Sequence, residues 1–344
     1  MILKELSEAF GVSGNEDDVR AIVLDAVREH VDEVKVDALG NVLAFKRGTG
    51  RQRMRVMLAA HMDEVGLMVV GHDNDGFLRV RSVGGIDPRL LPGTLLQVGS
   101  ERISGVIGAK PIHLLKENAD KVAKLEDLVV DVGAKSKDEA RKLAPLGTYA
   151  TFATRFRELG PTVRGKAFDD RAGCAVLVEL LRGERFRFDL HAVFTVQEEV
   201  GLRGARVAAY AIEPDCAFAL EGTVADDIPR DKDVSPTTEL GQGPAVTVMD
   251  RSFIADRRLV RLLTSTAEEL GIPYQIKQPG IGGTDAGAIH LTREGVPSVT
   301  VAVPCRYIHS PVALLSLDDF NNTVRLMRAS LARLTRRTMR RGRD

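Results

Sequence analysis

Tryptophan is absent from this sequence of 344 residues, and aromatic side chains make up only 5% of it. Carbohydrate-binding clefts usually offer aromatic platforms, so this composition argues against an enzyme that cleaves sugars. Cysteine is also scarce, because Cys174, Cys216 and Cys305 are widely spaced and form no C-x-x-C pair. An odd and scattered set of cysteines indicates a reducing compartment rather than a disulfide framework, so we expect a cytoplasmic protein.

An excess of charge of either sign is missing as well, because 48 lysines and arginines balance 48 aspartates and glutamates. Such a balance gives no support for a nucleic acid or an acidic lipid as a partner. No apolar run approaches the roughly 18 residues that indicate a membrane-spanning helix. The segment 1–10 lacks the basic region and the apolar region of a signal peptide. We therefore expect no membrane partner.

The length fits two domains, or one large α/β domain with an insertion. Predicted strands and helices alternate in the first part of the chain and again in its second half, which indicates a sheet sandwiched by helices. Between Gly66 and Pro161 the pattern changes to short β-like pieces with many glycines and turns. We therefore predict one α/β domain built from residues 1–65 and 164–344, interrupted by a β-rich domain at residues 66–163.

Most candidate functional residues stand where a predicted α/β strand ends. Ligands of open α/β sheets bind outside the carboxyl ends of the strands, so ionisable residues at these positions are candidates for a site. The candidates that follow a strand, or precede a helix just after the insertion, are His61, Asp63, Asp169, Asp170, Glu198, Glu199, Glu221 and His309. One edge of one sheet is thus predicted to gather two histidines and up to six carboxylates.

So many carboxylates cannot lie close together and remain ionised without a counter-charge. Two divalent cations would supply it, and imidazole with carboxylate but no thiolate suits zinc, cobalt or manganese. Such metal pairs commonly share a bridging carboxylate and polarise one water, and a free carboxylate beside that water can act as general base. Glu198 and Glu199 are adjacent, so one of them could bind metal while the other handles protons. Asp63 follows His61 by two residues and is a candidate to orient it.

Each of these residues also has an ordinary structural explanation. A histidine at the end of a strand is more often a surface or capping residue, and an Asp-Asp pair before a helix is usually an N-cap. The shared placement at strand ends strengthens the metal-site interpretation, but it does not identify the reaction. Ser13 and Asn15 are interpreted as a turn and N-cap signal for a helix that reaches about His30.

Seven short motifs follow one another along the chain. They are G-V-S-G-N-E at 11–16, A-H-M-D-E-V-G at 60–66, G-V-I-G-A-K-P-I-H at 105–113, G-K-A-F-D-D-R-A-G at 165–173, V-Q-E-E-V-G-L-R-G-A at 196–205, G-G-T-D-A at 282–286 and R-Y-I-H-S-P-V at 306–312. In this order they resemble the TET and glutamyl aminopeptidases, the dinuclear-metal peptidases of clan MH. Each motif alone would be weak, but together they span nearly the whole chain.

The resemblance implies a fold, an assembly and a metal site. The fold would be a mixed sheet flanked by helices, as in zinc peptidases, and the insertion would be a PDZ-like dimerisation domain. Members of the family commonly assemble dimers into hollow dodecamers, so a homo-oligomer is expected. His61 would bind one of two divalent metal ions, zinc or cobalt, and His309 the other, with Asp169 bridging both. Glu221 would complete the site of His61, and Glu199 that of His309.

The implied activity is hydrolysis of the N-terminal residue from peptides by a two-metal, bridging-water mechanism. Glu198 would be the general base that passes a proton to the leaving amine, and Asp63 would orient His61. Many relatives carry Asp where this chain has Glu221, whose extra methylene leaves its denticity open. Relatives also often carry an acidic residue where this chain has Ala313.

Several questions stay open at this point. Asp285 could face the substrate amine or cap a helix, Arg306 could contact substrate or pair with a carboxylate of the metal cluster, and His113 is interpreted as structural. A glycoside hydrolase and a non-catalytic peptide-binding scaffold are the alternative functions. The preferred N-terminal residue, the native metal, and the choice between dimer and dodecamer are not determined by the sequence.

Overall fold

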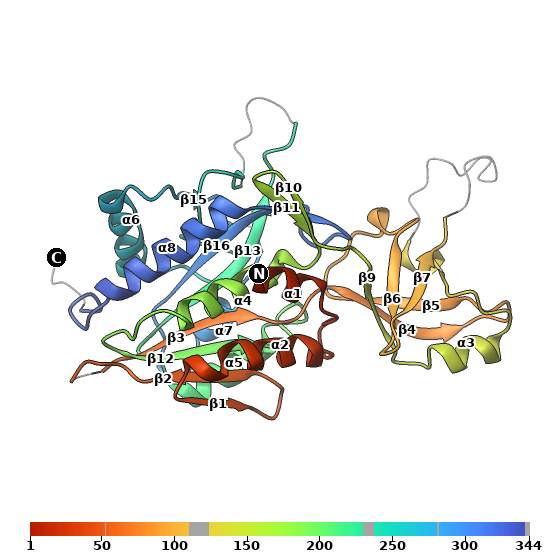
Figure 1. Cartoon of the computed structure of the whole chain (residues 1–344), viewed down its shortest axis with the longest axis horizontal. Coiled ribbons are helices and arrows are strands. Elements are labelled where there is room, and N and C mark those ends of the chain that lie inside the picture. Colours follow the sequence, from red (N-terminus) through yellow and green to blue (C-terminus); the bar gives the residue numbers. More distant parts are fainter. Residues whose placement is uncertain (52, 110–123, 230–236, 281, 341–344) are drawn as a thin grey trace.

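The computed structural model describes residues 1–51, 53–109, 124–229, 237–280 and 282–340. The chain forms an elongated molecule, with a larger α/β part at one end and a small barrel of strands at the other (Figure 1). The N-terminus lies within the larger part, and the C-terminal end lies far from the barrel (Figure 1). His113 lies outside the described residues.

The sheet of the larger part has 11 strands. Its centre consists of four neighbouring parallel strands, in the order β12 (Asp189–Thr195), β3 (Arg55–His61), β13 (Cys216–Ala225) and β16 (Ser298–Arg306). The outer strands are β1 (Glu33–Val36) and β2 (Val42–Lys46) beside β12, then β17 (Ala313–Ser316), β11 (Thr162–Gly165) and β10 (Arg157–Leu159) beside β16, and β14 (Ala245–Thr247) and β15 (Gln275–Lys277), which branch from β16. Parallel and antiparallel pairs occur together, so the sheet is mixed and the predicted α/β class is confirmed.

Strand β3 shows why helices cover both faces of this sheet. Val56, Leu58 and Ala60 alternate along it with Met57 and Ala59, and all five residues are fully buried. The first three join a hydrophobic cluster with α1 (Ile2–Glu8), α2 (Asp17–Val27), α4 (Phe168–Leu181), α6 (Arg257–Leu270) and α8 (Leu317–Arg333). The other two join a second cluster with α5 (Arg203–Ile212) and α7 (Ala286–Ile289). A strand that is apolar on both sides requires cover on both faces.

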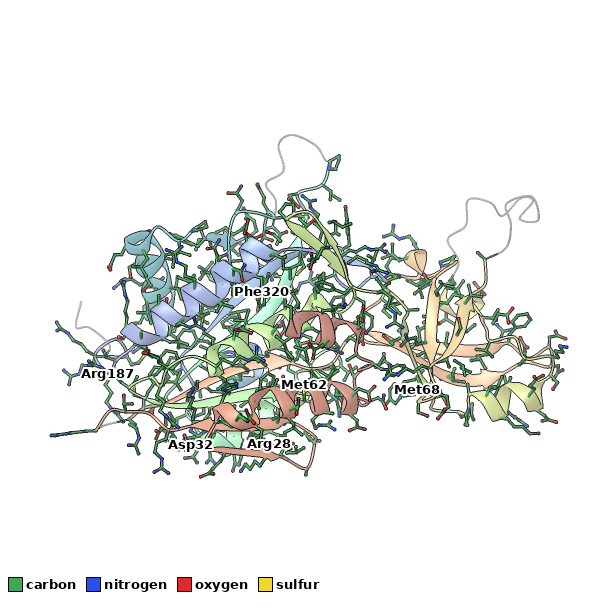
Figure 2. The ribbon with its side chains drawn as sticks, in the orientation of Figure 1. Arg28, Asp32, Met62, Met68, Arg187 and Phe320 are labelled. Atoms are coloured by element: carbon green, nitrogen blue, oxygen red, sulfur yellow. The ribbon has the colours of Figure 1, made fainter. Side chains whose placement is uncertain are left out.

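The barrel contains six strands and its own hydrophobic core. Around it run β4 (Gly66–His72), β5 (Leu78–Val83), β8 (Val130–Asp131), β7 (Ile103–Ile107), β6 (Leu95–Val98) and β9 (Tyr149–Phe152), and α3 (Lys137–Leu143) precedes β9. The chain enters it directly from β3, so that Met62 lies in the larger part and Met68 lies on β4 (Figure 2). A small β-rich subdomain inserted after residue 64 is therefore present, as the sequence predicts.

The return from the barrel differs in detail from the predicted range 66–163. Strands β10 and β11 fall largely within that range, yet β10 pairs with β11, and β11 pairs with β17 of the large sheet. The last barrel strand, β9, ends at Phe152. The strand pairing therefore favours a boundary between β9 and β10, and the division of the chain into two domains stays a prediction.

Two elements have other lengths than the sequence predicts. Strand β13 continues to Ala225 instead of ending at Leu220, because it stays paired with β16 along its whole length. Helix α7 has 4 residues and ends at Ile289 instead of reaching Arg293, whose φ of +53° does not fit a helix. Within the described ranges, no helix combines the length and the apolarity needed to cross a membrane.

A buried ionic cluster ties the N-terminal segment to the centre of the fold. Lys166 Nζ lies 2.6 and 2.8 Å from the two carboxylate oxygens of Glu64 and donates to the carbonyl of Ala9 at 2.7 Å. Arg171 Nη2 lies 3.3 Å from Glu64, and Nη1 donates to the carbonyl of Leu6 at 2.5 Å. Burial lowers the pKa of Lys166 to about 8, although the charge of Glu64 opposes this shift.

We expect Lys166→Met to lower the free energy of unfolding by about 3–5 kcal/mol, because it leaves the Glu64 carboxylate buried without its closest counter-charge. Urea denaturation followed by circular dichroism measures the change. Arg81→Met is the matched control, since its ion pair with Glu126 is exposed to solvent and such pairs contribute little. Similar unfolding midpoints for the two variants would contradict the stabilising role of the cluster.

Candidate active site

The carboxyl ends of the four central strands meet at one edge of the large sheet. His61 is the last residue of β3, and the segment with Glu198 and Glu199 directly follows β12. Glu221 lies within β13, two residues beyond Ala219, which pairs with Ala59 of β3. Around a cavity of about 380 Å³ the structure brings together His61, Asp169, Glu198, Glu199, Glu221 and His309. The predicted gathering of ionisable side chains therefore occurs.

Asp169 lies between the two histidines and presents one oxygen to each. Its Oδ1 is 3.2 Å from Nε2 of His61, and its Oδ2 is 3.4 Å from Nε2 of His309. Each histidine also faces one further carboxylate: His61 Nε2 is 3.5 Å from Glu221 Oε2, and His309 Nε2 is 3.4 Å from Glu199 Oε1. The side chains thus form two groups of donors that share Asp169.

These separations can be compared with the needs of a metal ion. A tetrahedral ion with nitrogen and oxygen ligands at about 2.0–2.1 Å holds its ligand atoms about 3.3 Å apart. The four histidine–carboxylate separations range from 3.2 to 3.5 Å, and every donor is an imidazole nitrogen or a carboxylate oxygen. The residues therefore fit two divalent ions bridged by Asp169.

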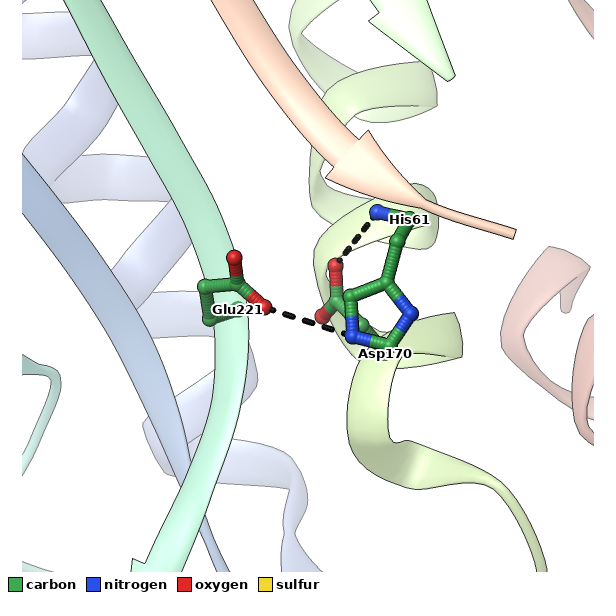
Figure 3. A group of neighbouring side chains, drawn as sticks. All are labelled: His61, Asp170 and Glu221. Carbon is green, nitrogen blue, oxygen red and sulfur yellow. Dashed lines mark hydrogen bonds and ion pairs between the residues drawn. The ribbon is translucent and has the colours of Figure 1, made fainter. Parts of the chain in front are cut away.

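Asp170 is also drawn into this edge, but backbone groups occupy its oxygens. Its Oδ2 accepts a hydrogen bond from the backbone N–H of His61 at 3.1 Å, and Oδ1 accepts from that of Gly173 at 2.9 Å. Figure 3 shows Asp170 beside His61, while Glu221 approaches the ring of His61 from β13. Asp170 thereby fastens the start of α4 to the end of β3, and we assign it to positioning rather than to a metal.

The segment after β12 is held by side chains from three other parts of the chain. Four successive backbone N–H groups, those of residues 196–199, each donate to a side-chain oxygen at 3.0–3.2 Å. In order, the acceptors are Asn41 Oδ1, Glu16 Oε1, Asp63 Oδ1 and Asp63 Oδ2. The segment therefore has a fixed shape, which sets the directions of the Glu198 and Glu199 side chains.

Asp63 connects this segment with His61. Nδ1 of His61 is 3.1 Å from the backbone carbonyl of Asp63 and 3.5 Å from its Oδ1, so the carbonyl is the closer partner. Ser13 Oγ donates to Asp63 Oδ2 at 2.5 Å. Burial would raise the pKa of Asp63, but the hydrogen bonds with His61, Ser13 and the N–H of Glu198 lower it overall. Asp63 therefore remains an acceptor for all of these groups.

The interpretation of Ser13 as a helix cap is wrong. Helix α2 has Glu16 at its N-cap position, without a side-chain capping hydrogen bond, whereas Ser13 reaches Asp63 across 50 residues of sequence. Ser13, Glu16 and Asn41 are functional candidates that strand-end reasoning missed. The one available signal was the motif at 11–16, which contains two of them.

A loop of the barrel reaches the second histidine. His309 has a φ of +56°, and its Nδ1 is 2.8 Å from the backbone carbonyl of Gly85, between β5 and β6. A donor at Nδ1 leaves Nε2 as the free nitrogen that faces Asp169 and Glu199. The insertion therefore contributes directly to the orientation of a candidate metal ligand.

Comparison with known proteins identifies the family. The model of the M42 glutamyl aminopeptidase family matches residues 40–326. The chain belongs to this family. The resemblance that the motifs indicate is thereby confirmed, and with it the aminopeptidase class of hydrolase.

Individual M42-like relatives match along almost their whole lengths. A putative aminopeptidase of Acetivibrio thermocellus is 41% identical over 95% of this chain and 96% of its own. The lysyl aminopeptidase of Pyrococcus furiosus is 38% identical over 97% of this chain and 96% of its own. The structure of aminopeptidase APDkam598 from Desulfurococcus kamchatkensis has a TM-score of 0.94 at 39% identity, covering 98% and 95% of the two chains. The Pyrococcus horikoshii TET1 peptidase, which assembles into a tetrahedron or an octahedral shell, has a TM-score of 0.85 at 36% identity, covering 97% and 99%.

The electrostatics of this M42 site support a need for additional positive charge. Burial raises the pKa of Glu199 to about 7, against the opposing charge of His309. Burial also raises the pKa values of Glu198 and Glu221 well above their usual range, and neighbouring carboxylates add to both shifts. The protein alone therefore disfavours full ionisation of this cluster, which fits ligands for divalent cations.

Two residues that the sequence left ambiguous have defined surroundings. Asp285 occupies the N-cap position of α7 without a capping hydrogen bond, and its Oδ2 instead accepts from the hydroxyl of Thr195. Arg306 forms a bidentate pair with Asp227 at 2.6 and 2.7 Å, so the expected pairing with a carboxylate of the metal cluster does not occur. Neither contact involves a proposed metal ligand side chain.

The barrel loop offers a test of the second metal site. A side chain at Gly84, where φ is +80°, would place its Cβ 2.8 Å from Val65 Cγ1 and 3.3 Å from Glu199 Cβ. We expect Gly84→Val to displace the loop that orients His309 and to weaken binding of the nearby ion by about 10- to 100-fold. Metal content after dialysis, measured by mass spectrometry, reports the loss.

Gly93→Val is the matched control, because Gly93 has a φ of +82° in the same connection, but a Cβ added there would meet no atom within 4 Å. It introduces the same backbone strain without reaching the site. Equal metal content in the two variants would contradict the role of the barrel loop.

Proposed function

We propose that the chain is a dinuclear metalloaminopeptidase that removes N-terminal residues from peptides, with zinc or cobalt as its ions. The observation that carries this proposal is the position of Asp169, whose two oxygens face His61 and His309 at 3.2 and 3.4 Å. Membership of the M42 family supports the same reaction. Glu221 would complete the site of His61, and Glu199 that of His309.

The ions, when bound, supply Lewis acidity that activates the attacking water and stabilises the charge that develops on the scissile carbonyl. The protein's own part is to hold five ligand side chains at fixed separations and to place a base beside them. Glu198 suits the role of base, because Oε2 lies 3.9 Å from His61 Nε2 and outside both ligand groups that share Asp169.

Glu198 would take a proton from the attacking water and pass it to the leaving amine. Burial raises its pKa, and a base whose pKa lies closer to neutrality both accepts and releases a proton readily. Asp63 holds the backbone on either side of this carboxylate and orients His61. The substrate would enter with its free amine and first peptide bond at the metal pair.

The alternative functions account for fewer of these observations. Glycoside hydrolysis requires two carboxylates and no histidine ligands, whereas here each histidine faces two carboxylates at 3.2–3.5 Å. A non-catalytic peptide-binding scaffold would not need an unassigned buried carboxylate such as Glu198 beside the ligands. Both alternatives are therefore less favoured than peptide hydrolysis.

The assembly and the compartment are further parts of the proposal. The barrel would serve as a PDZ-like dimerisation domain, and the chain would form a homo-oligomer, as the similarity to Pyrococcus horikoshii TET1 supports. The three cysteines are free and buried, which is compatible with the cytoplasm. The expectation that no nucleic acid or membrane binds the chain stays a prediction.

Removal of metal tests the reaction class. We expect hydrolysis of aminoacyl-p-nitroanilides to disappear after treatment with EDTA and to return when zinc or cobalt is restored, because both ligand groups consist of metal-binding side chains. The release of p-nitroaniline is followed by absorbance. Activity that persists after the metal content has fallen to background would contradict the proposal.

Glu198→Gln tests the base. The variant retains the shape of the side chain but accepts no proton, so we expect kcat to fall by about 100- to 10,000-fold while two ions per chain remain bound. Glu33→Gln, an exposed substitution on β1, is the matched control and should hydrolyse substrates at the normal rate. A near-normal rate for Glu198→Gln would reassign the base.

A further inference from the structure

The cavity extends from the carboxylates onto three strands of the sheet. Thr300 on β16, Thr247 on β14 and Lys277 on β15 all line it. Thr247 pairs directly with Thr300 on one side and with Lys277 on the other. Residues directly opposite each other on adjacent strands point to the same face, so these three side chains form a row across the cavity floor, the β14 row.

Two polar groups of the β14 row have no partner. Lys277 is only 5% exposed, and among the described residues no hydrogen bond or ion pair reaches its ammonium group. Thr247 is fully buried, and its hydroxyl has no hydrogen-bond partner within the described ranges. Thr300, by contrast, shares a hydrogen bond of 2.9 Å with Thr284.

Such unpaired groups are unusual in a folded protein. Buried polar side chains almost always have a hydrogen-bond partner, and a buried charge without one is especially costly. Lys277 is also the one lysine or arginine among the described residues that line the cavity. A ligand that enters the cavity with a carboxylate would supply the missing acceptor for both Lys277 and Thr247.

A purely structural role for Lys277 is the alternative. Burial lowers the pKa of Lys277, while the negative charges of Asp250, Asp169 and Glu221 raise it, so the lysine could simply balance these carboxylates. Yet none of these three described carboxylates forms an ion pair with its ammonium group. Charge balance alone also leaves the hydroxyl of Thr247 unexplained.

We propose that the β14 row is the pocket for the first side chain of the substrate and selects a carboxylate, so that the enzyme prefers peptides beginning with glutamate or aspartate. This inference rests on the proposed function, because the same cavity contains the metal ligands where the amine and the scissile bond would lie. A side chain that projects from that position toward Lys277 would exchange its hydration for a charge-assisted hydrogen bond.

Binding without turnover tests the pocket. The zinc-loaded Glu198→Gln protein is titrated calorimetrically with the tripeptides Glu-Ala-Ala and Gln-Ala-Ala, which differ at the side chain only in the carboxylate. We expect the glutamyl peptide to bind about 10- to 100-fold more tightly, as for a hydrogen bond between charged groups. The aspartyl and asparaginyl peptides form a second pair that reports on the depth of the pocket. Equal affinities within both pairs would overturn the proposal.

Substitution of the lysine provides a second measurement. In the Glu198→Gln background, Lys277→Met should reduce the Glu-to-Gln affinity ratio to about 1, and Lys277→Glu should favour Lys-Ala-Ala instead. Lys35→Met, an exposed substitution on β1, is the matched control and should leave the ratio unchanged. A ratio that survives Lys277→Met would overturn the assignment of Lys277.

The two proposals fail in different ways. Wild-type protein that cleaves p-nitroanilides in a metal-dependent manner, but cleaves the glutamyl and glutaminyl substrates equally, would overturn the acidic pocket and leave the aminopeptidase intact. Protein that cleaves no substrate, but whose Glu-to-Gln affinity ratio depends on Lys277, would support the pocket and contradict the proposed reaction.

Discussion

The carboxylate of Asp63 is the interaction on which the rest of the site depends. It accepts the backbone N–H groups of Glu198 and Glu199 and the hydroxyl of Ser13. Its own backbone carbonyl meets Nδ1 of His61. These bonds can form together only when β3 and β12 lie side by side in their parallel register, because the acceptor and the donors leave the ends of two different strands. The base and one candidate metal ligand are thus fixed by a single buried side chain.

The sequence could predict those parts of the site that follow from the sheet. Parallel strands bring their carboxyl ends to one edge, so residues after apolar runs, such as His61 and Glu199, could be assigned to a shared site. Glu16 and Asn41 could not, because they reach Gln197 and Val196 across 181 and 155 residues from segments with no strand-end pattern.

The parts that escaped prediction depend on pairings that no local pattern encodes. The β14 row requires β14 and β15, two strands of 3 residues each, to attach beside β16, and nothing in their sequences specifies that order. The partner of Arg306, Asp227, is likewise set by tertiary structure. The fold class and the barrel could be predicted because they depend on long stretches with consistent periodicity.

The complete use of the N–H groups at residues 196–199 constrains how the enzyme can stabilise its transition state. Many hydrolases that act on acyl groups surround the developing oxyanion with backbone amides. Here the four amides nearest the base already donate to Asn41, Glu16 and Asp63, so they cannot turn toward a substrate without breaking the segment that positions Glu198. The chain has committed its local backbone dipoles to architecture, and catalysis must draw its positive charge from elsewhere in the cavity.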